Sequence, residues 1–234
     1  MCTLSILPIQ DKLIITMNRD ERYDRVESKN MCVTKNFAHP CDAKKGGTCF
    51  GINRHGIIMA LLNRYDIYYK KTNLSRGRFI PELLSFQTIT DVIDAFHEMH
   101  MPHDNPFEIF LISKSKAVCI RWDGELRTTK EFSLAKPLLF TSSSANPKAV
   151  SQFRKKLFKE FIQNTGANEI TSDVILHNLH MRYMPNMLSS AILMRRNTTH
   201  TKSITQAVLS DYEISISYWP EEVIADKIHA NNYS

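Results

Sequence analysis

The hydrophobic pattern at the start of the chain predicts a β-hairpin. Residues 3–7 and 13–17 are mostly apolar or β-branched, and the short polar turn Gln10-Asp11 lies between them. A second β region is expected after Gly46-Gly47, where residues 57–62 form a continuous apolar run. Such a run is typical of a strand that is buried on both faces.

Helical periodicity appears in the next segment and returns in the second half of the chain. One stripe runs through Phe79, Leu83 and Leu84, and a second follows a capping box formed by Thr88 and Asp91. A long amphipathic helix is predicted over residues 147–163, and a short one over residues 172–179 with Ser172 as its cap. The long helix has apolar positions with basic ones between them: Val150, Phe153, Leu157, Phe158 and Phe161, and Arg154, Lys155, Lys156 and Lys159.

Strand patterns follow the first helices and close the chain. Residues 108–112 and 117–122 are predicted strands, and a final hairpin is expected from residue 203, with its turn at Ser210-Asp211. No linker or internal repeat interrupts the sequence, so we expect a single domain over residues 1–234. The order of strands and helices favours an α+β fold of layered sheets with helices outside.

Composition and charge narrow the class of protein. The chain is 43% hydrophobic and 23% charged, with a net charge of +6 and a pI near 9.0. A basic surface attracts nucleic acid or an anionic small molecule, but no nucleic-acid-binding motif is present, so we expect no nucleic-acid partner. No apolar run approaches the roughly 20 residues of a membrane span, and no secretory signal is recognisable, so a cytoplasmic location is expected. The oligomeric state stays open.

The five cysteines predict reduced thiols rather than disulfides or a metal site. They are odd in number and show no C-x-x-C spacing. Cys32, Cys41 and Cys49 lie near His39, but they are spaced more widely than the usual zinc-ligand pairs. We therefore expect no bound metal.

Cys2 is the residue with the most distinctive chemistry. If Met1 is removed, Cys2 carries both a thiol nucleophile and a free α-amino group, whose ordinary pKa of about 8 allows it to act as a base. The predicted hairpin brings Asn18-Arg19-Asp20-Glu21 beside this residue. There Arg19 would favour the thiolate, and Asp20 would hold the α-amino group or orient Arg19. The alternative is a solvated salt bridge at the end of an edge strand.

An ordered set of motifs resembles the NRDE family, which includes the transport and Golgi organisation proteins. The motifs are Met1-Cys2-Thr3, Asn18-Arg19-Asp20-Glu21, Gly46-Gly47-Thr48 with Gly51-Ile52-Asn53, Leu62-Asn63, Ser75-Arg76-Gly77 and Trp122-Asp123-Gly124. The resemblance implies a four-layer α-β-β-α sandwich similar to the N-terminal-nucleophile (Ntn) hydrolases, with mainly antiparallel sheets. Among these, penicillin V acylases and choloylglycine hydrolases hydrolyse amides and also begin with Met-Cys.

The same resemblance assigns roles to particular residues. Cys2, Arg19, Asp20 and Asn63 are the expected catalytic residues, and Asn63 would donate to the oxyanion. The expected substrate-binding residues are Asn18, Glu21, Arg76, Ser142 and Lys202. Three positions differ from the family pattern: Ser142 replaces an asparagine, Lys202 an arginine and Cys49 an aromatic residue. The implied reaction is hydrolysis of the C–N amide bond of a small acylated substrate, with no required cofactor.

Histidines and methionines form a second constellation that favours a different function. They fall in two groups: His97, Met99, His100, Met101 and His103, and His177, His180, Met181, Met184 and Met187. Such side chains can ligate haem iron, and the family resemblance also implies a link to haem trafficking. His100 and His180 are therefore candidate haem ligands in a non-catalytic carrier of haem or another amphipathic anion. Core packing by Met and helix-end His is the structural alternative, and a trafficking or Golgi-organisation factor is a third function.

Overall fold

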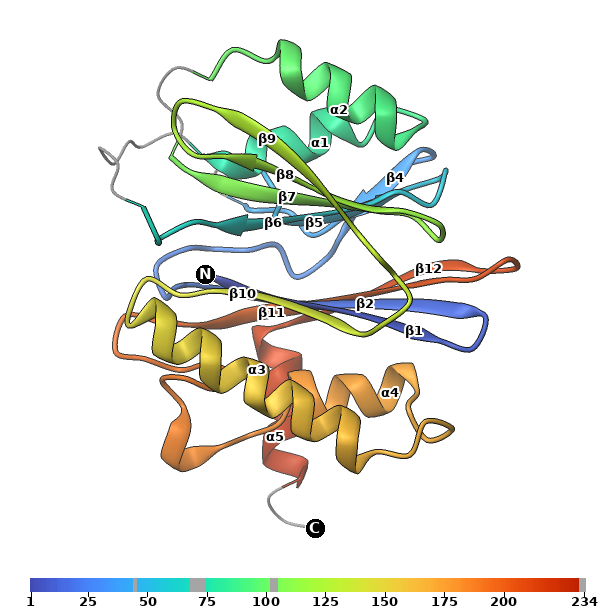
Figure 1. Cartoon of the computed structure of the whole chain (residues 1–234). Helices are drawn as coiled ribbons and strands as arrows, with labels where there is room; N and C mark the ends of the chain where they lie inside the picture. The colour runs from blue at the N-terminus through green and yellow to red at the C-terminus, as the bar shows by residue number, and fades with distance from the viewer. Residues whose placement is uncertain (44–45, 68–74, 102–104, 232–234) are drawn as a thin grey trace.

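The computed structural model describes residues 1–43, 46–67, 75–101 and 105–231. Two stacked β-sheets form its centre, and every strand pairing in the described part of the chain is antiparallel. Figure 1 shows α1 and α2 on the outer side of one sheet and α3, α4 and α5 on the outer side of the other. The predicted four-layer α-β-β-α sandwich is confirmed.

The five-stranded sheet carries the N-terminal hairpin. Its strand order is β10-β1-β2-β11-β12. The bounds are β1 (Cys2–Ile9), β2 (Lys12–Arg22), β10 (Leu138–Ser142), β11 (Thr199–Leu209) and β12 (Ile214–Pro220). Both predicted hairpins are therefore present, and the first turns at Gln10, which adopts the left-handed φ of 53°. β10 closes one edge of this sheet next to β1.

The seven-stranded sheet contains the middle of the chain in the order β3-β4-β5-β6-β7-β8-β9. Its bounds are β3 (Cys32–Val33), β4 (Phe37–His39), β5 (Phe50–Asn53), β6 (Ile58–Asn63), β7 (Phe107–Ile112), β8 (Ala117–Trp122) and β9 (Arg127–Phe132). The apolar run of residues 57–62 is almost entirely the predicted buried strand, β6, at the centre of this sheet.

The helices lie on the outer faces of the two sheets. They are η1 (Arg76–Arg78), α1 (Phe79–Leu83), α2 (Ile89–Glu98), α3 (Pro147–Asn164), α4 (Ser172–Ile175), the π-helical turn η2 (Leu176–His180), η3 (Pro185–Met187) and α5 (Glu221–Asn231). The capping box of Thr88 and Asp91 is present at α2. The cap of α4 is Thr171 rather than the predicted Ser172. Within the described residues, no helix is both long and apolar enough to span a bilayer.

Alternation along β1 divides its side chains between two layers. Cys2, Leu4 and Ile6 point into the core between the sheets, whereas Leu7 packs with α3 and α4. Cys2 therefore belongs to the inter-sheet core at the start of the chain, and Figure 1 shows the N-terminus between the two sheets.

Candidate functional site

Cys2 lies opposite Arg19 of β2 on one side and Ser142 of β10 on the other. Its backbone N–H donates to Ser142 Oγ at 3.3 Å. The side chain is 4% exposed. The hairpin thus produces the expected juxtaposition of Cys2 and Arg19, and β10, a strand that the sequence analysis did not predict, adds Ser142.

The amino terminus is anchored on the backbone of β2. The Met1 ammonium donates to the Asp20 carbonyl oxygen at 3.1 Å, and Asp20 N–H donates to the Met1 carbonyl oxygen at 2.8 Å. Burial by itself would lower the pKa of the Met1 amine, but negative groups around it, first Tyr65 and then Cys2 and Asp20, raise that pKa to about 11. A positive charge therefore stands beside the Cys2 thiol.

Arg19 is held in place by three acidic residues. Its guanidinium lies 3.4 Å from Glu27 Oε2, 3.3 Å from Asp42 Oδ2 and 3.6 Å from Glu21 Oε2. Burial opposes the charge on this side chain, but the acidic neighbours outweigh it and raise the pKa of Arg19, so the guanidinium stays charged beside Cys2. Glu27 and Asp42 were not identified from the sequence, because neither belongs to a short motif with Arg19.

The ionisation of the Cys2 thiol depends on a second thiol. Hydrogen bonding with Cys49 is the main cause that lowers the pKa of Cys2 to about 7. Burial opposes the shift, whereas the charges of the amino terminus and Arg19 support it. In return, the pKa of Cys49 rises well above its ordinary value. Cys2 is therefore the thiolate of the pair.

Two glycine motifs fix this part of the site. A Cβ on Gly47 would lie 2.8 Å from the carbonyl carbon of Gly77, and a Cβ on Gly77 would lie 2.8 Å from Thr48 O. Thr48 N–H donates to Gly77 O at 3.0 Å. Two backbones approach this closely only where neither carries a side chain. The contact sets the positions of Cys49, which follows Thr48, and of Arg76, which precedes Gly77.

Asn63 and Arg76 both interact with Tyr65, which lies near the amino terminus. Asn63 Nδ2, at the end of β6, donates to the Tyr65 hydroxyl at 3.1 Å. Burial would raise the pKa of Tyr65, but the charged amino terminus, within hydrogen-bonding reach, and Arg76 lower it. Arg76 Nη1 also donates to the Pro106 carbonyl oxygen at 3.1 Å. Tyr65 was missed because no spacing rule connects it with Cys2.

The carboxylate of Asp20 lies on the helix side of the sheet, away from Cys2. Arg154 Nη2 of α3 lies 3.3 Å from Asp20 Oδ2, and Thr201 Oγ1 lies 2.7 Å from Asp20 Oδ1. Both members of the Asp20–Arg154 ion pair have fully buried side chains. The expectation that the Asp20 side chain holds the amino group or orients Arg19 is therefore corrected: Asp20 binds the amino terminus through its main-chain carbonyl group.

Asn18 is also on this inner side, so its predicted contact with substrate is wrong. Asn18 Nδ2 donates to the carbonyl oxygens of His180 (3.0 Å) and Ile192 (3.2 Å). Asn18 Oδ1 is hydrogen bonded to His180 Nδ1, and Ser5 Oγ lies 2.7 Å from His180 Nε2. Because Asn18 Oδ1 only accepts, Nδ1 carries the ring proton and Nε2 accepts from Ser5. All three polar side chains are buried and satisfied.

The two candidate haem ligands do not lie together. His180 is fully buried beneath the five-stranded sheet with both ring nitrogens hydrogen bonded. His100 is exposed and follows α2, on the outer side of the other sheet. A shared iron between them is therefore excluded in this structure. His103 lies outside the described residues. Within the described ranges, no cluster of three or more His, Cys, Asp or Glu residues is arranged to hold a metal ion.

The buried His180 predicts a loss of stability in mild acid. Burial lowers its pKa from 6.5 to about 3. Below pH 6.5, His180 is protonated in the unfolded chain but stays neutral in the folded chain. The free energy of unfolding therefore decreases as the pH is lowered, by up to about 1.4 kcal/mol per pH unit. Between pH 7 and pH 5, the free energy of unfolding of the wild type should therefore fall by about 2 kcal/mol more than that of His180→Gln. Urea unfolding at the two pH values measures this difference. His100→Gln is the exposed control. Parallel pH profiles for all three proteins would contradict the assignment.

Lys202 is engaged elsewhere, and Arg196 supplies the cation near the amino terminus. Lys202 Nζ donates to Glu221 Oε2 at 2.7 Å, so its charge is paired within the protein, and its contact with substrate stays a prediction. Arg196 Nη1 lies 3.2 Å from Met1 Sδ, and Arg196 Nη2 donates to Ser143 Oγ at 2.9 Å. Residues 174–210 include several basic residues and no acidic one, but this composition does not single out Arg196.

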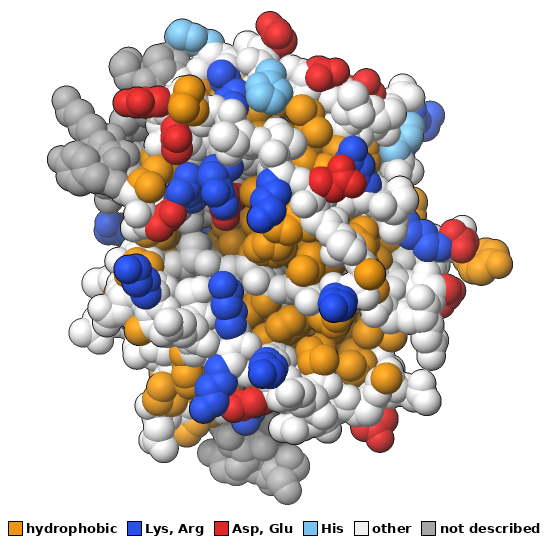
Figure 2. All heavy atoms as spheres, in the orientation of Figure 1, with side chains coloured by type: hydrophobic (Ala, Val, Ile, Leu, Met, Phe, Trp, Pro, Cys, Tyr) orange, Lys and Arg blue, Asp and Glu red, His pale blue; other side chains and the backbone are white. Residues whose placement is uncertain are grey.

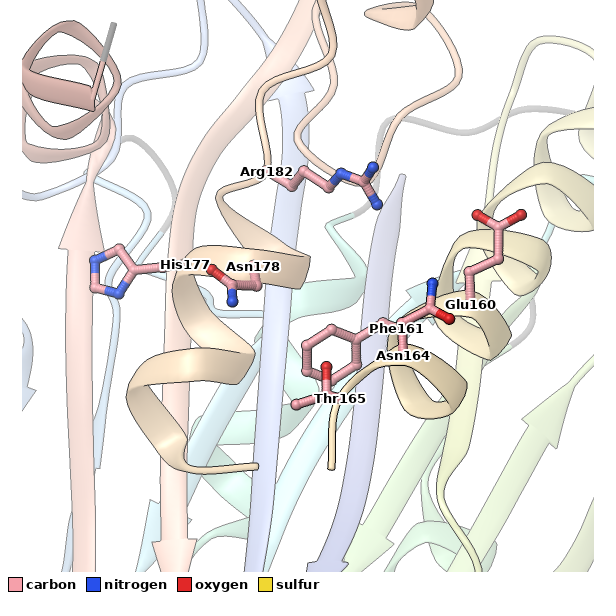
Figure 3. A pocket seen from close by; sticks show the side chains of 7 residues that line it. All are labelled: Glu160, Phe161, Asn164, Thr165, His177, Asn178 and Arg182. Carbon is pink, nitrogen blue, oxygen red and sulfur yellow. The ribbon is translucent and has the colours of Figure 1, made fainter. Parts of the chain in front are cut away.

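A separate cavity of about 350 Å³ lies away from this site, between α3 and η2. Figure 3 shows its lining residues on those two segments and just after them, including Phe161 of α3, Asn178 of η2 and Arg182 beyond η2. It belongs to the helix layer, and none of the predicted site residues lines it.

The charge state of Cys2 gives a direct pH prediction. Because its pKa is lowered to about 7, alkylation of Cys2 by iodoacetamide should rise with pH around a midpoint near 7. Cys119, whose pKa burial raises to about 12, should stay unmodified over the same range. Mass spectrometry of digested protein measures both rates. A Cys2 midpoint near 9, the ordinary thiol value, would contradict the described environment.

Comparison with solved structures agrees with the layered architecture. The Caenorhabditis elegans ortholog of N-acylethanolamine-hydrolyzing acid amidase is similar, with a TM-score of 0.59 and 17% identity over 89% of this chain and 92% of the other. The C2A mutant of conjugated bile acid hydrolase from Clostridium perfringens has a TM-score of 0.54 and 12% identity over 95% and 93%. At these identities the likeness establishes the fold alone, that of the Ntn hydrolases.

Sequence comparison identifies the family. No curated protein sequence matches the chain. The family profile described as Transport and Golgi organisation 2, however, matches residues 1–219. This span includes every motif that carried the predicted resemblance. The chain therefore belongs to the Transport and Golgi organisation 2 (TANGO2) family.

Proposed function

We propose that this protein is an N-terminal-cysteine amidohydrolase that becomes competent when removal of Met1 leaves Cys2 with a free α-amino group. The observation that carries the proposal is the convergence of the Cys2 thiol, the Arg19 guanidinium and the amino terminus between the sheets. The fold supports it, since two proteins of similar structure are hydrolases, one of them an acid amidase ortholog. While Met1 is present, the nitrogen of Cys2 is a peptide nitrogen and cannot act as a general acid or base.

The reaction then proceeds in two halves. The Cys2 thiolate attacks the amide carbonyl, and the S–C bond forms as the C–N bond breaks. The α-amino group of Cys2 delivers the proton to the leaving amine. Water, deprotonated by the same amino group, attacks the thioester, and the acid leaves as the thiol re-forms. Ser142 Oγ, which already accepts from the Cys2 nitrogen, positions that amino group for both transfers.

Asn63 is the proposed oxyanion donor. Its Nδ2 group donates to Tyr65 beside the amino terminus and would turn to the substrate oxygen as charge develops there. Arg19 holds the thiolate, since its own acidic partners keep it charged and fixed. The main-chain carbonyl oxygen of Asp20 holds the ammonium group of Met1, so this contact is released when Met1 is removed.

The surroundings favour an acylated substrate with an apolar acyl part and an anionic group. Half-buried apolar side chains, among them Phe132, Leu138 and Phe140, pack against the core that contains Cys2. Figure 2 shows hydrophobic side chains gathered in the middle of the face that it draws, with Lys and Arg side chains around them. Near Met1, Arg196 and Arg76 are the cations placed to meet negative charge.

Mass spectrometry tests the proposal without a known substrate. The intact mass of the purified protein shows whether Met1 is absent. In protein without Met1, a β-lactone probe, which acylates thiolates as its strained ring opens, should modify Cys2 faster than the other thiols, namely Cys32, Cys41, Cys49 and Cys119. If Cys2 reacts no faster than the exposed Cys32, the hydrolase proposal is wrong.

A further inference from the structure

Met1 is buried next to the candidate nucleophile, and each of its polar atoms has a partner. Its side chain is 7% exposed. Arg196 Nη1 lies 3.2 Å from Met1 Sδ, and Ser144 Oγ lies 3.0 Å from the same sulfur. The Asp20 carbonyl oxygen accepts from the Met1 ammonium at 3.1 Å, and Asp20 N–H donates to the Met1 carbonyl oxygen at 2.8 Å. We call the space that Met1 fills, between Arg196, Ser144 and the main chain of Asp20, the residue-1 site.

The groups that line the residue-1 site are fixed by contacts that do not involve Met1. Asp20 lies within β2, which pairs with β1 on one side and β11 on the other. Arg196 Nε donates to the Ser189 carbonyl oxygen at 2.8 Å, and Arg196 Nη2 donates to Ser143 Oγ at 2.9 Å. Removal of Met1 therefore leaves a hollow whose polar groups are already in position.

The emptied site presents a positive charge without a close anion. Within the described ranges, the side chain of Arg196 contacts a main-chain carbonyl oxygen, a hydroxyl and the Met1 sulfur, with no carboxylate among them. The sulfur is a weak acceptor, and it leaves with Met1. Burial, and after it the positive charge of Arg154, lower the pKa of Arg196. A carboxylate that enters this site therefore meets a cation that the protein itself leaves uncompensated.

The position of Met1 decides which part of a substrate enters the site. The carbonyl carbon of Met1 is bonded to the Cys2 nitrogen, so the vacated space directly adjoins the new α-amino group. In the proposed mechanism that group protonates the leaving amine, so the amine side of the substrate amide must face this space. The acyl side then faces the half-buried apolar side chains, such as Phe132 and Phe140, that pack against the core containing Cys2.

We propose that the residue-1 site binds an α-amino acid as the leaving group, so that the substrates of the hydrolase are N-acyl α-amino acids. The inference rests on the proposed function. The substrate nitrogen takes the place of the Met1 nitrogen, where the Asp20 carbonyl oxygen accepts its proton. The carboxylate lies at the place of the Met1 sulfur, where Arg196 Nη1 and the Ser144 hydroxyl donate to it.

The reaction consumes one water molecule and needs no other reactant. The C–N bond of the amide breaks, and a C–O bond to the acyl carbon forms after the thioester stage. The acyl part leaves as a carboxylate, and the amino acid leaves with its nitrogen protonated. The Asp20 carbonyl oxygen, which holds the Met1 ammonium in this structure, holds the product ammonium in the same way.

A pair of matched substrates tests the inference in protein that begins at Cys2. A fusion whose protease cleaves directly before Cys2 supplies this form, and intact mass verifies it. The substrates are N-decanoyl-L-methionine and N-decanoyl-L-methioninol, which differ only in a carboxylate against an uncharged hydroxymethyl group. We expect kcat/KM for the acid to exceed that for the alcohol on the order of ten- to a hundredfold, the usual effect of a hydrogen bond to a charged group.

Variants of two neighbouring arginines locate the origin of this preference. Arg196→Met should bring the ratio of the two kcat/KM values close to one, whereas Arg196→Lys, which keeps the charge, should retain part of the preference. Arg195→Met, an exposed neighbour, should leave the wild-type ratio unchanged. Because the ratio compares two substrates in one protein, a partial loss of folded protein does not alter it. If Arg196→Met fails to fold, product inhibition of the wild type by L-methionine, with L-methioninol a much weaker inhibitor, provides the same comparison.

Two kinds of result would overturn the inference and leave the hydrolase proposal standing. One is a ratio near one, or a preference for the alcohol, in the wild type, or an acid preference that Arg196→Met retains in full. The other is hydrolysis of neither substrate by protein in which the β-lactone probe labels Cys2. If the probe fails to label Cys2 preferentially as well, the hydrolase proposal is wrong and this inference falls with it.

Discussion

Replacing Cys2 with serine is expected to reduce acylation by the β-lactone probe on the order of a thousandfold or more, while the protein stays folded. A serine hydroxyl is almost entirely protonated where the Cys2 thiol, with its pKa near 7, is substantially ionised. The change preserves the shape of a small side chain that is 4% exposed, so the core should tolerate it. The measurement is probe labelling by mass spectrometry in protein without Met1, together with a thermal melt.

Cys32→Ser is the matched control for this substitution. Cys32 is an exposed cysteine on the short strand β3, and its replacement should leave labelling of Cys2 and the melting temperature unchanged. Equal labelling rates at position 2 for the serine variant and the wild type would show that the thiolate is not the nucleophile. A Cys2→Ser variant that unfolds would be replaced by Cys2→Ala, which removes the nucleophile without introducing a buried hydroxyl.

The elements that the sequence predicted well are those whose side chains alternate between a buried and an exposed surface, or are buried throughout. The N-terminal hairpin, β6 and α3 all have strong apolar patterns, and the structure confirms each of them. β9 was missed because its sequence, Arg127–Phe132, is largely polar and exposed at the edge of its sheet. The short strands β3 and β4 offer too few residues for any periodicity.

Arg154 shows where a pattern was present but was interpreted wrongly. In the sequence pattern it is one of the basic residues that lie between the apolar positions of α3. In the structure it is fully buried, and the buried side of α3 consists of Val150, Arg154, Leu157, Phe158 and Phe161. Arg154 lies four residues after Val150 and three before Leu157, which is the spacing of one helix face. A charged residue in such a stripe needs a buried partner, and here the partner is Asp20.

The candidate site was predictable to the extent that it follows from one strand pairing. The hairpin places Arg19 opposite Cys2, and that register follows from the two-residue turn. Cys49 and Tyr65 come from the other sheet, and their approach depends on how the sheets stack and on the Gly47–Gly77 contact. Side-chain direction also decided the outcome at Asn18, which neighbours Arg19 in sequence but faces the opposite layer because strand side chains alternate.

The buried Asp20–Arg154 pair carries the largest stability prediction. Arg154→Met should lower the free energy of unfolding by about 3–5 kcal/mol, because it leaves the Asp20 carboxylate buried without its cation. Arg154 also donates to Thr3 Oγ1 at 2.7 Å and to the Ala191 carbonyl oxygen at 3.0 Å, and those acceptors lose their donor as well. Urea unfolding at neutral pH measures the change.

The origin of that loss is tested by a second substitution and by pH. If the unpaired charge is the cause, the double variant Arg154→Met with Asp20→Asn should be more stable than the sum of the two single changes predicts. Burial already raises the pKa of Asp20 in spite of its partners, and without Arg154 that pKa should rise further. Between the unfolded and folded pKa values of Asp20 the folded state holds the extra proton, so the stability deficit of Arg154→Met should shrink as pH falls through that window.

Lys155→Met, an exposed neighbour on the same helix, is the control and should change the free energy of unfolding by less than about 0.5 kcal/mol. An Arg154→Met variant that loses no more than this control would mean that the buried pair contributes nothing to the stability of the fold.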